Sequence, residues 1–365
     1  MFKIRPEFLI PTKSYADNTP TAAKETLDCS LGINPYGFPP AVTAAIRAFD
    51  PVRLADYPHT HGAGQAILHS WSDLAPGLGM ENLILCDGSI SALYLINNLF
   101  SKPGAEVVGF VPTFTDMSVN AQMLGMRYTG VAMTLEESPL ADVESLLAAV
   151  TPETALVYVD NPNNPTGRTL SLDQLARIAQ RARDCGAFLL VDEAYGDFIP
   201  KEESALTLWD RFDNLLITRT FSKGFGLAGL RAGYIAAPAE LAGYIGKISN
   251  PYMMNELART AVTAALTDEA WPRAHAEAFA AVKQAVRDRG GSALTLLPTD
   301  RRVPICTLRH RDPTVDLQRR LFDFGVLTVS GGEFDGLNKS SVRLRVPLSQ
   351  DAAPLLQAVE TLGRE

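Results

Sequence analysis

The sequence predicts an α/β protein whose larger domain is a doubly wound, mainly parallel sheet, followed by a smaller α+β domain. Between residues 46 and 250, short apolar runs alternate with helical patterns, and this alternation is typical of a parallel sheet with helices on both faces. Several runs are apolar at odd and even positions alike, as in strands covered on both faces. The 365 residues, 46% of them hydrophobic, suffice for a large buried core.

Six apolar runs of the larger domain are predicted strands. They cover residues 81–86, 105–111, 154–160, 187–193, 214–221 and 231–237. A helix is predicted over residues 171–186, because Ser171 is a good N-cap residue and Gly186 lies just past the end of the helical pattern. A helix in that place allows the strands before and after it to run parallel.

The pattern changes after Pro251. The alanine-rich residues 255–290 predict a long helix that is interrupted or kinked near Pro272. Beyond it, the predicted elements are strands over residues 303–309, 325–331 and 341–348 and a helix over residues 313–324. We therefore expect an amino-terminal arm of residues 1–45 that belongs to the smaller domain, a large domain of residues 46–250 and a small carboxy-terminal domain of residues 251–365.

The composition argues against several classes of protein. A net charge of −8, from 41 acidic and 33 basic residues, argues against nucleic-acid binding, which needs clustered positive charge. No stretch approaches the roughly 20 apolar residues of a membrane span, and the start of the chain lacks the apolar core of a signal peptide. The four cysteines (Cys29, Cys86, Cys185 and Cys306) are scattered without metal-site spacing. We expect a cytoplasmic protein with free thiols and no metal site.

One segment imitates a dinucleotide-binding motif. Residues 224–229 fit G-x-G-x-x-G and follow a predicted strand. A dinucleotide site would next need a crossover helix of roughly ten or more residues and then a parallel strand. Because the next strand-like segment begins at Arg231, the sequence argues against this interpretation.

The same segment is better explained as a pocket for a phosphate. In an extended chain the hydroxyls of Thr220 and Ser222 project to one side. Lys223 follows at the end of the predicted strand and Arg231 comes soon after the glycines. Hydroxyls, cations and glycine-exposed backbone can together bind a phosphate, and ligands of open α/β sheets gather at the carboxyl ends of strands.

Polar residues also follow three other predicted strands. Asp192 comes at the end of an apolar run, where a carboxylate can keep a pyridine nitrogen protonated, and Tyr195 lies three residues on. Asn164 belongs to a loop that two prolines and a glycine make rigid, and it can donate to a phenolic oxygen. Gly88 and Ser89 open a helix whose free N–H groups can bind an anion. An ordinary turn or capped helix would explain each feature taken alone.

These features occur in a fixed order and together resemble a known family. The motifs, in order, are Gly88-Ser89, Pro112-Thr113-Phe114, Asn161–Gly167, Asp192–Tyr195, Ser222-Lys223 and Gly229-Leu230-Arg231. Their order and spacing resemble the fold-type I pyridoxal-phosphate enzymes of the class I and II aminotransferases, over about residues 31–348. The most similar branch is that of histidinol-phosphate aminotransferase and threonine-phosphate decarboxylase.

The resemblance implies that the chain binds pyridoxal 5'-phosphate. Lys223 would form a Schiff base with the cofactor and then move the proton at the substrate Cα, and Asp192 would pair with the pyridine nitrogen. The other implied contacts are bonds from Tyr195 and Asn164 to the phenolic oxygen, stacking of Phe114 on the ring, and phosphate binding by Gly88, Ser89, Ile90, Thr220, Ser222 and Arg231. Many relatives have Tyr in place of Phe114, so a possible hydroxyl contact is absent.

The resemblance also implies a substrate site and a homodimer. Arg345 matches the arginine that forks onto the substrate carboxylate. Arg343 shares its face of the predicted strand, so the two could exchange roles. Asn34, in an arm like that of the family, is a second substrate-binding candidate. Tyr57 matches a tyrosine that reaches the phosphate of the neighbouring subunit, which implies shared active sites.

Transamination and decarboxylation both remain open within this branch. Residues Ile33–Gly37, with Ile where histidinol-phosphate transaminases usually have Glu, and residues Phe334–Leu337 resemble the decarboxylase. Because the arm also fits transaminases in general, we favour an aminotransferase that acts on an amino acid or an amino-phosphate, with an O-phospho-amino-acid decarboxylase as the alternative. A non-catalytic cofactor-binding protein is a remote third interpretation, since Lys223 and Asp192 are both present.

Overall fold

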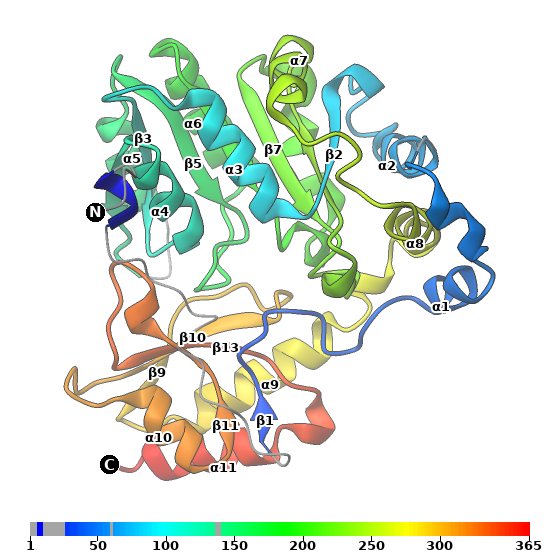
Figure 1. Ribbon diagram of the computed structural model, residues 1–365. Coiled ribbons are helices and arrows are strands. Elements are labelled where there is room, and N and C mark those ends of the chain that lie inside the picture. The colour runs from blue at the N-terminus through cyan, green and yellow to red at the C-terminus, as the bar shows by residue number, and fades with distance from the viewer. Residues whose placement is uncertain (1–5, 10–25, 59–60, 136–139) are drawn as a thin grey trace.

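A seven-stranded sheet forms the larger part of the computed structural model, which describes residues 6–9, 26–58, 61–135 and 140–365 (Figure 1). Its strands, in spatial order, are β2 (Leu83–Cys86), β8 (Gly233–Ala236), β7 (Leu215–Thr220), β6 (Phe188–Asp192), β5 (Thr154–Asp160), β3 (Glu106–Val111) and β4 (Arg127–Ala132). Neighbouring strands are parallel, except that β8 is antiparallel to both β2 and β7. The predicted mainly parallel sheet is confirmed.

The seventh strand, β4, is absent from the sequence prediction. It lies at the edge of the sheet beside β3, and its residues are exposed or half-buried. A strand in that position does not need the continuous apolar run of a strand that is buried on both faces. The sequence signal that identifies the central strands is therefore weak at β4.

Helices cover both faces of the large sheet, as predicted. One face carries α2 (Gly62–Trp71), α5 (Leu140–Ala149), α6 (Leu172–Asp184) and α8 (Glu256–Ala265), and the other carries α3 (Ser89–Phe100), α4 (Thr115–Met123) and α7 (Ala239–Ile248). Successive side chains of a strand point to opposite faces, so Val157 of β5 packs in the first layer and Tyr158 in the second. This arrangement explains why the central strands are apolar at both parities.

The predicted helix over residues 171–186 is α6. The Ser171 hydroxyl accepts from the backbone N–H of Gln174 at 3.3 Å, and the Gln174 side chain accepts from the N–H of Ser171 at 2.9 Å. This reciprocal pair is a capping box, which satisfies two N–H groups at the start of a helix. Gly186 follows the helix with a φ of +73°, which glycine adopts without steric cost.

The fully described stretch between β7 and β8 holds only a single 3-10 turn, at Ala228–Leu230. After this turn β8 runs back antiparallel to β7. A dinucleotide-binding motif needs a crossover helix that leads to a parallel strand. The match of residues 224–229 to G-x-G-x-x-G is therefore coincidental.

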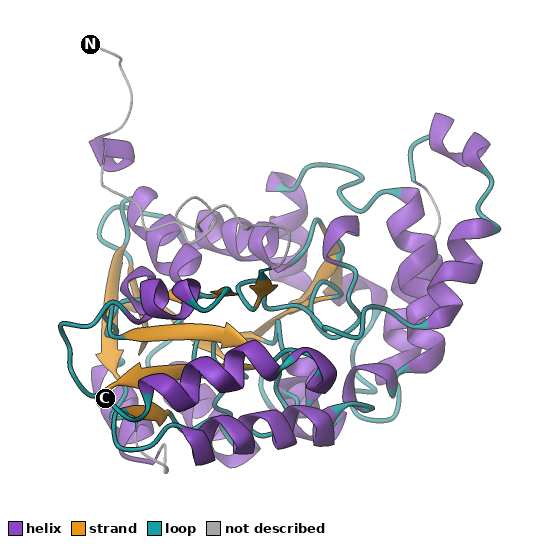
Figure 2. Cartoon of the chain, turned by 90° about the horizontal axis from the view of Figure 1, so that it is seen from below, coloured by secondary structure: helices purple, strands orange, loops and turns teal. Residues whose placement is uncertain are grey.

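A smaller antiparallel sheet lies below the large one in Figure 1. Its strands, in spatial order, are β12 (Val329–Ser330), β13 (Ser341–Arg345), β10 (Ile305–His310) and β9 (Leu294–Leu296). Helices α9 (Ala276–Arg289), α10 (Leu317–Asp323) and α11 (Ala353–Leu362) share a separate apolar core with it, and Figure 2 shows helices running along the strands of this part. Beside it, β1 (Leu27–Asp28) pairs in parallel with β11 (Val326–Leu327).

The alanine-rich segment is split into α8 and α9, with a 3-10 turn at Trp271–Arg273. This break agrees with the interruption predicted at Pro272. Helix α8 packs on α2 and on α1 (Pro40–Arg47), within the core of the large sheet. Helix α8 follows residue 250 and yet packs with the large sheet. The domain boundary predicted near residue 250 therefore stays a prediction.

The amino-terminal arm is described only in part, since residues 1–5 and 10–25 of the predicted segment 1–45 lie outside the described residues. From β1 the chain passes to the end of β7, where the backbone N–H of Asn34 donates to the carbonyl oxygen of Lys223 at 3.1 Å. The arm thereby connects the smaller sheet with the large one. Among the described helices, none is both long enough and apolar enough to cross a bilayer.

Candidate active site

The carboxyl ends of β5, β6 and β7 meet at an open cavity of about 610 Å³. Nine residues singled out in the sequence line it: Ser89, Ile90, Phe114, Asn164, Asp192, Tyr195, Ser222, Lys223 and Arg231. Asp160, Pro162, Ala194 and Ala228 complete the lining. The cavity lies at the sheet edge where α/β proteins bind ligands.

Lys223 follows β7 and points its amine toward this cavity. The arm holds this stretch of backbone, because the Asn34 N–H donates to the carbonyl oxygen of Lys223 at 3.1 Å and the Asn34 side-chain amide to that of Gly224 at 2.9 Å. Burial, and next the charges of Arg343 and Arg231, lower the pKa of Lys223 to about 8. A buried lysine with a lowered pKa has a larger neutral fraction and is a better nucleophile toward a carbonyl carbon.

Asp192 ends β6 and lines the same cavity as Lys223, together with a second carboxylate, that of Asp160. It accepts a hydrogen bond from the Thr218 hydroxyl at 2.9 Å and another from the backbone N–H of Ala194 at 3.2 Å. Burial raises the pKa of Asp192 to about 7, and the nearby charge of Asp160 adds to the rise. A protonated ring nitrogen beside this carboxylate would offset the cost of burying its charge.

Asp160 is a site residue that the sequence prediction missed. It ends β5 in direct register with Asp192 and accepts four hydrogen bonds, from the Thr113 hydroxyl, the Asn163 amide and the backbone N–H groups of Phe114 and Asn164. Its carboxylate thus fixes the two loops that carry Phe114 and Asn164. The rule that identified Asp192, an acid at the end of an apolar run, applies equally to residues 154–160.

The candidate phosphate corner is formed by Arg231, Ser222 and the first turn of α3. One guanidinium nitrogen of Arg231 donates to the Ser222 hydroxyl at 3.3 Å, and another to the carbonyl oxygen of Asp87 at 3.2 Å. Gly88 precedes α3 with a φ of +89°, and a Cβ there would lie 2.8 Å from Arg231 Nη2. The N–H groups that open a helix lack intrahelical acceptors and attract anions. Thr220 stands behind, donating to the Ser222 hydroxyl at 2.9 Å.

Arg231 itself has a left-handed backbone, with a φ of +52°. This conformation costs a residue with a Cβ roughly 1–2 kcal/mol. Such local strain is most often found at functional sites, where the surrounding structure maintains it. Here the strained backbone directs the guanidinium toward Ser222 and the start of α3.

Tyr195 and the arm form another wall of the site. The Tyr195 side chain is buried, and its ring centre lies 5.8 Å from Lys223 Nζ. Gly32 of the arm packs so closely that a Cβ at this position would collide with the Tyr195 hydroxyl. The position of the phenol is therefore coupled to the path of the arm.

The structure places the two arginines of β13 (Arg343 and Arg345) in different surroundings. Arg343 is buried and its Nη1 lies 3.4 Å from the Asn164 side-chain oxygen at the cavity, whereas Arg345 donates to the carbonyl oxygen of Asp28. The two side chains follow the same face of β13, but two residues along a strand amount to about 6.6 Å. Of these two arginines, it is Arg343 whose charge lowers the pKa of Lys223.

Tyr57 does not line the cavity of its own chain. Its side chain is 70% exposed and stacks on Tyr252, with 4.8 Å between the ring centres. The segment lies beyond α2 and α8, at the edge of the molecule (Figure 1). The residues that follow, 59 and 60, lie outside the described residues.

Comparisons with known proteins show the family to which the chain belongs. The family model of the class I and II aminotransferases matches residues 25–362. A histidinol-phosphate aminotransferase 2 of Ralstonia nicotianae is 36% identical over 68% of this chain and 65% of its own length. The histidinol-phosphate aminotransferase 2 of Nitrosospira multiformis is 33% identical over 65% of this chain and 59% of its own length. The chain thus spans somewhat less than two thirds of these two relatives. A histidinol-phosphate aminotransferase of Roseobacter denitrificans is 32% identical over 73% of this chain and 72% of its own length.

Solved structures support the fold. A histidinol-phosphate aminotransferase of Sinorhizobium meliloti, in complex with pyridoxal-5'-phosphate, has a TM-score of 0.81 at 23% identity and covers 100% of this chain and 98% of its own. An aspartate aminotransferase of Thermus thermophilus with maleate has a TM-score of 0.84 at 21% identity, over 99% and 100% of the two chains. At these identities the likeness concerns the fold alone.

Proposed function

The chain belongs to the class I and II aminotransferase family, and from this premise we propose that it is a pyridoxal-phosphate-dependent aminotransferase acting on an amino acid or an amino-phosphate. The observation that carries the proposal is the buried amine of Lys223, with a lowered pKa, in one cavity with Asp192 and Arg231. These three groups match an aldehyde, a ring nitrogen and a phosphate on one small molecule.

The residues present fit that cofactor. Its phosphate fits the corner made by Ser222, Arg231 and the first turn of α3, where hydroxyl, guanidinium and backbone N–H groups converge. Its ring nitrogen fits Asp192, whose buried carboxylate lacks a cationic partner among the described residues that bond to it. Phe114 and Ala194 also line the cavity, and their side chains offer apolar surface for the ring.

When bound, pyridoxal phosphate supplies an aldehyde that reacts with amines and a ring that accepts electrons from the substrate Cα. Lys223 would hold the cofactor through its amine and, once freed, would take the proton from the substrate Cα. Asp192 keeps the ring nitrogen protonated, which makes the ring a stronger electron acceptor. Tyr195 and Asn164 are placed by this proposal at the phenolic oxygen, where they orient the ring.

Arg343 is proposed to hold the substrate carboxylate. We expect Arg343→Gln to raise KM for the amino acid by about 100-fold, because a buried guanidinium that binds a charged group contributes several kcal/mol. Arg345→Gln is the matched control on the same strand face, and its KM should stay within about threefold of the parent value. Steady-state kinetics of both variants measure this difference. A larger loss in the Arg345 variant would return the role to that residue.

The lowered pKa of Lys223 predicts how cofactor uptake depends on pH. Attack on an aldehyde requires the neutral amine, and with a pKa of about 8 roughly 10% of the lysines are neutral at pH 7. The uptake rate of cofactor-free protein should rise about tenfold per pH unit up to pH 8 and then level off. Stopped-flow absorbance measures the rate. A rate that still climbs tenfold between pH 9 and 10 would show an ordinary lysine.

Transamination is favoured over decarboxylation because the curated relatives described above are named as aminotransferases. The test is a panel of amino acids and their O-phosphates, added to the loaded protein. Transamination predicts a shift of the visible band to the amine form of the cofactor, reversed by a keto acid. Release of carbon dioxide without any need for a keto acid would instead establish the decarboxylase alternative, and loading without any turnover the non-catalytic one.

We further propose a homodimer in which Tyr57 serves the partner's site. Val52, Leu54 and Tyr57 are exposed by 59–70% on one projecting segment, which is typical of a surface that another chain covers. Co-expression of Lys223→Ala and Tyr57→Ala chains tests the arrangement. Hybrid dimers would hold one complete site, so activity should recover to about a quarter of the parent value. Activity no higher than that of the separate variants would refute the shared site.

A cytoplasmic location is also part of the proposal. The four cysteines are free, and Cys29, Cys86 and Cys306 are buried, which suits a reducing compartment. Fractionation of the source cells, with the protein followed by antibody, tests the location. Recovery outside the cytoplasmic fraction would contradict it.

A further inference from the structure

A buried cluster of charged side chains lies behind the end of β7, on the face opposite the candidate active site. Its centre is Arg219, between Thr218 and Thr220. Neighbouring side chains of a strand point to opposite faces. Thr218 and Thr220 face the site, since they donate to Asp192 and Ser222, and Arg219 therefore points away from it.

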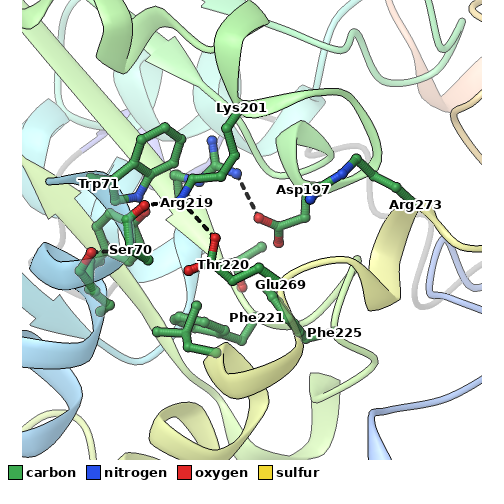
Figure 3. A pocket seen from close by; sticks show the side chains of 13 residues that line it. Ser70, Trp71, Asp197, Lys201, Arg219, Thr220, Phe221, Phe225, Glu269 and Arg273 are labelled. Carbon is green, nitrogen blue, oxygen red and sulfur yellow. Dashed lines mark hydrogen bonds and ion pairs between the residues drawn. The ribbon is translucent and has the colours of Figure 1, made fainter. Parts of the chain in front are cut away.

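Arg219 bridges two carboxylates. It forms ion pairs with Glu193 and with Asp197, the latter at 2.6 Å from Nη2 to Oδ1, and its side chain is only 5% exposed. The guanidinium also lies over the Trp71 ring, 4.9 Å from its centre. Figure 3 shows Arg219 and Asp197 in the small pocket that Trp71 and Lys201 also line. Their charges are satisfied within the cluster, so we assign it no ligand.

Glu193 and Asp197 enclose the short turn that carries Tyr195 at its centre. Glu193 is fixed independently, because it accepts from the Ser204 hydroxyl and from the backbone N–H of Ala205, each at 2.6 Å. The guanidinium of Arg219 links Asp197, at the other end of the turn, to this fixed carboxylate. The guanidinium also packs against the residue that follows Tyr195, since a Cβ on Gly196 would lie 2.9 Å from Arg219 Nη1.

We propose that Arg219 is a positioning residue for Tyr195: by bracing both ends of the turn of residues 193–197, it aims the phenol at the cofactor oxygen. The inference rests on the proposed function. An arginine suits the task because its planar fork binds two carboxylates at once, whereas a lysine is a single point charge on a flexible stem. Lysine in its place would hold one end of the turn and release the other.

The test reads the hydrogen bond of Tyr195 rather than turnover. Lysine-bound pyridoxal phosphate changes its visible absorbance when the imine nitrogen loses its proton. The phenolate oxygen then loses the N–H group that donated a hydrogen bond to it. A phenol that donates to this oxygen favours the deprotonated form. Tyr195→Phe should therefore raise the midpoint of the pH titration, by about one unit, since a hydrogen bond to a charged group has that magnitude.

Arg219→Lys should raise the midpoint in the same direction, by about half a unit, and should add little to Tyr195→Phe in the double variant. Arg302→Lys is the matched control, because Arg302 also forks between two carboxylates, Glu203 and Asp300, away from the cavity. Its midpoint should not move. Asp197→Asn provides a second variant that cuts the same brace without removing the arginine, and the same rise is expected.

An Arg219→Lys protein that melts cooperatively but keeps the parent midpoint would overturn the inference, as would shifts that add fully to those of Tyr195→Phe. Should Arg219→Lys fail to fold, the titration of Asp197→Asn decides by the same two criteria. A parent protein that shows no pH-dependent visible band with pyridoxal phosphate would overturn the proposed function together with the inference. An unchanged midpoint in the Arg219→Lys protein overturns the inference about Arg219 but leaves the proposed function standing.

Discussion

Lys223→Ala is expected to lower turnover of the preferred amino acid by about 10³-fold or more, because it removes both the covalent attachment point and the group that moves the proton at Cα. Reduction of the parent protein with borohydride should fix the cofactor irreversibly to this residue. Mass spectrometry of the digested protein identifies the modified lysine. A modified lysine elsewhere, or none, would contradict the role of Lys223.

The chain contains a matched control for this experiment. Lys283 is also buried, and burial lowers its pKa to about 8 as well. Its amine, however, donates to the Thr299 hydroxyl at 2.8 Å and to the carbonyl oxygen of Asp300 at 2.7 Å, outside the cavity. Lys283→Ala should therefore lower the melting temperature while leaving kcat nearly unchanged. Equal losses of kcat in both variants would mean that burial, and not chemistry, explains the effect.

Asp192→Asn is expected to lower kcat by roughly 10²–10³-fold, the range for a lost electrostatic contact to a reacting system. An amide cannot keep the ring nitrogen protonated, so the ring becomes a weaker electron acceptor. Glu106→Gln is the control, because Glu106 is likewise buried in the large sheet but pairs with Arg127. It should retain nearly full turnover. A fully active Asp192→Asn protein would refute the proposed pairing.

The same variant has a stability signature in the absence of cofactor. Since the pKa of Asp192 is raised to about 7 in the folded chain, this group contributes stability below its ordinary pKa near 4 that is lost as the pH rises through 7. Asparagine removes that dependence. Relative to the parent, Asp192→Asn should therefore gain thermal stability on going from pH 5 to pH 8, as thermal melts of the cofactor-free proteins can measure.

The sequence predicts the central elements well because their signal is local. The strands β5, β6 and β7 are continuous apolar runs, and burial on both faces is what produces such runs. The edge strand β4 has one exposed side and gives no comparable run. The packing of α8 on α2 depends on contacts between distant parts of the chain, and no local pattern encodes such contacts.

Within the candidate site, the sequence identifies polar residues that follow strand ends. It does not show how the strands align with one another or which side chains extend to the cavity. Arg343 and Arg345 have the same residue type and lie on the same strand face, and only the position of β13 beside Asn164 distinguishes them. Asp160 is recognisable by the same rule as Asp192, yet its four donors come from two loops. The role proposed for Arg219 depends on where its guanidinium lies relative to Glu193 and Asp197, which spacing along the chain does not reveal.

The close packing of Gly32 on the Tyr195 hydroxyl limits which substitutions the chain can accept in the arm. No side chain fits at position 32 while the phenol keeps its place. Under the proposed function, a substitution at position 32 would displace the phenol that is proposed to contact the cofactor. Directed evolution of specificity should therefore leave Gly32 fixed and draw its variants from the residues that follow. At this position, the sequence of the arm and the placement of Tyr195 cannot change independently.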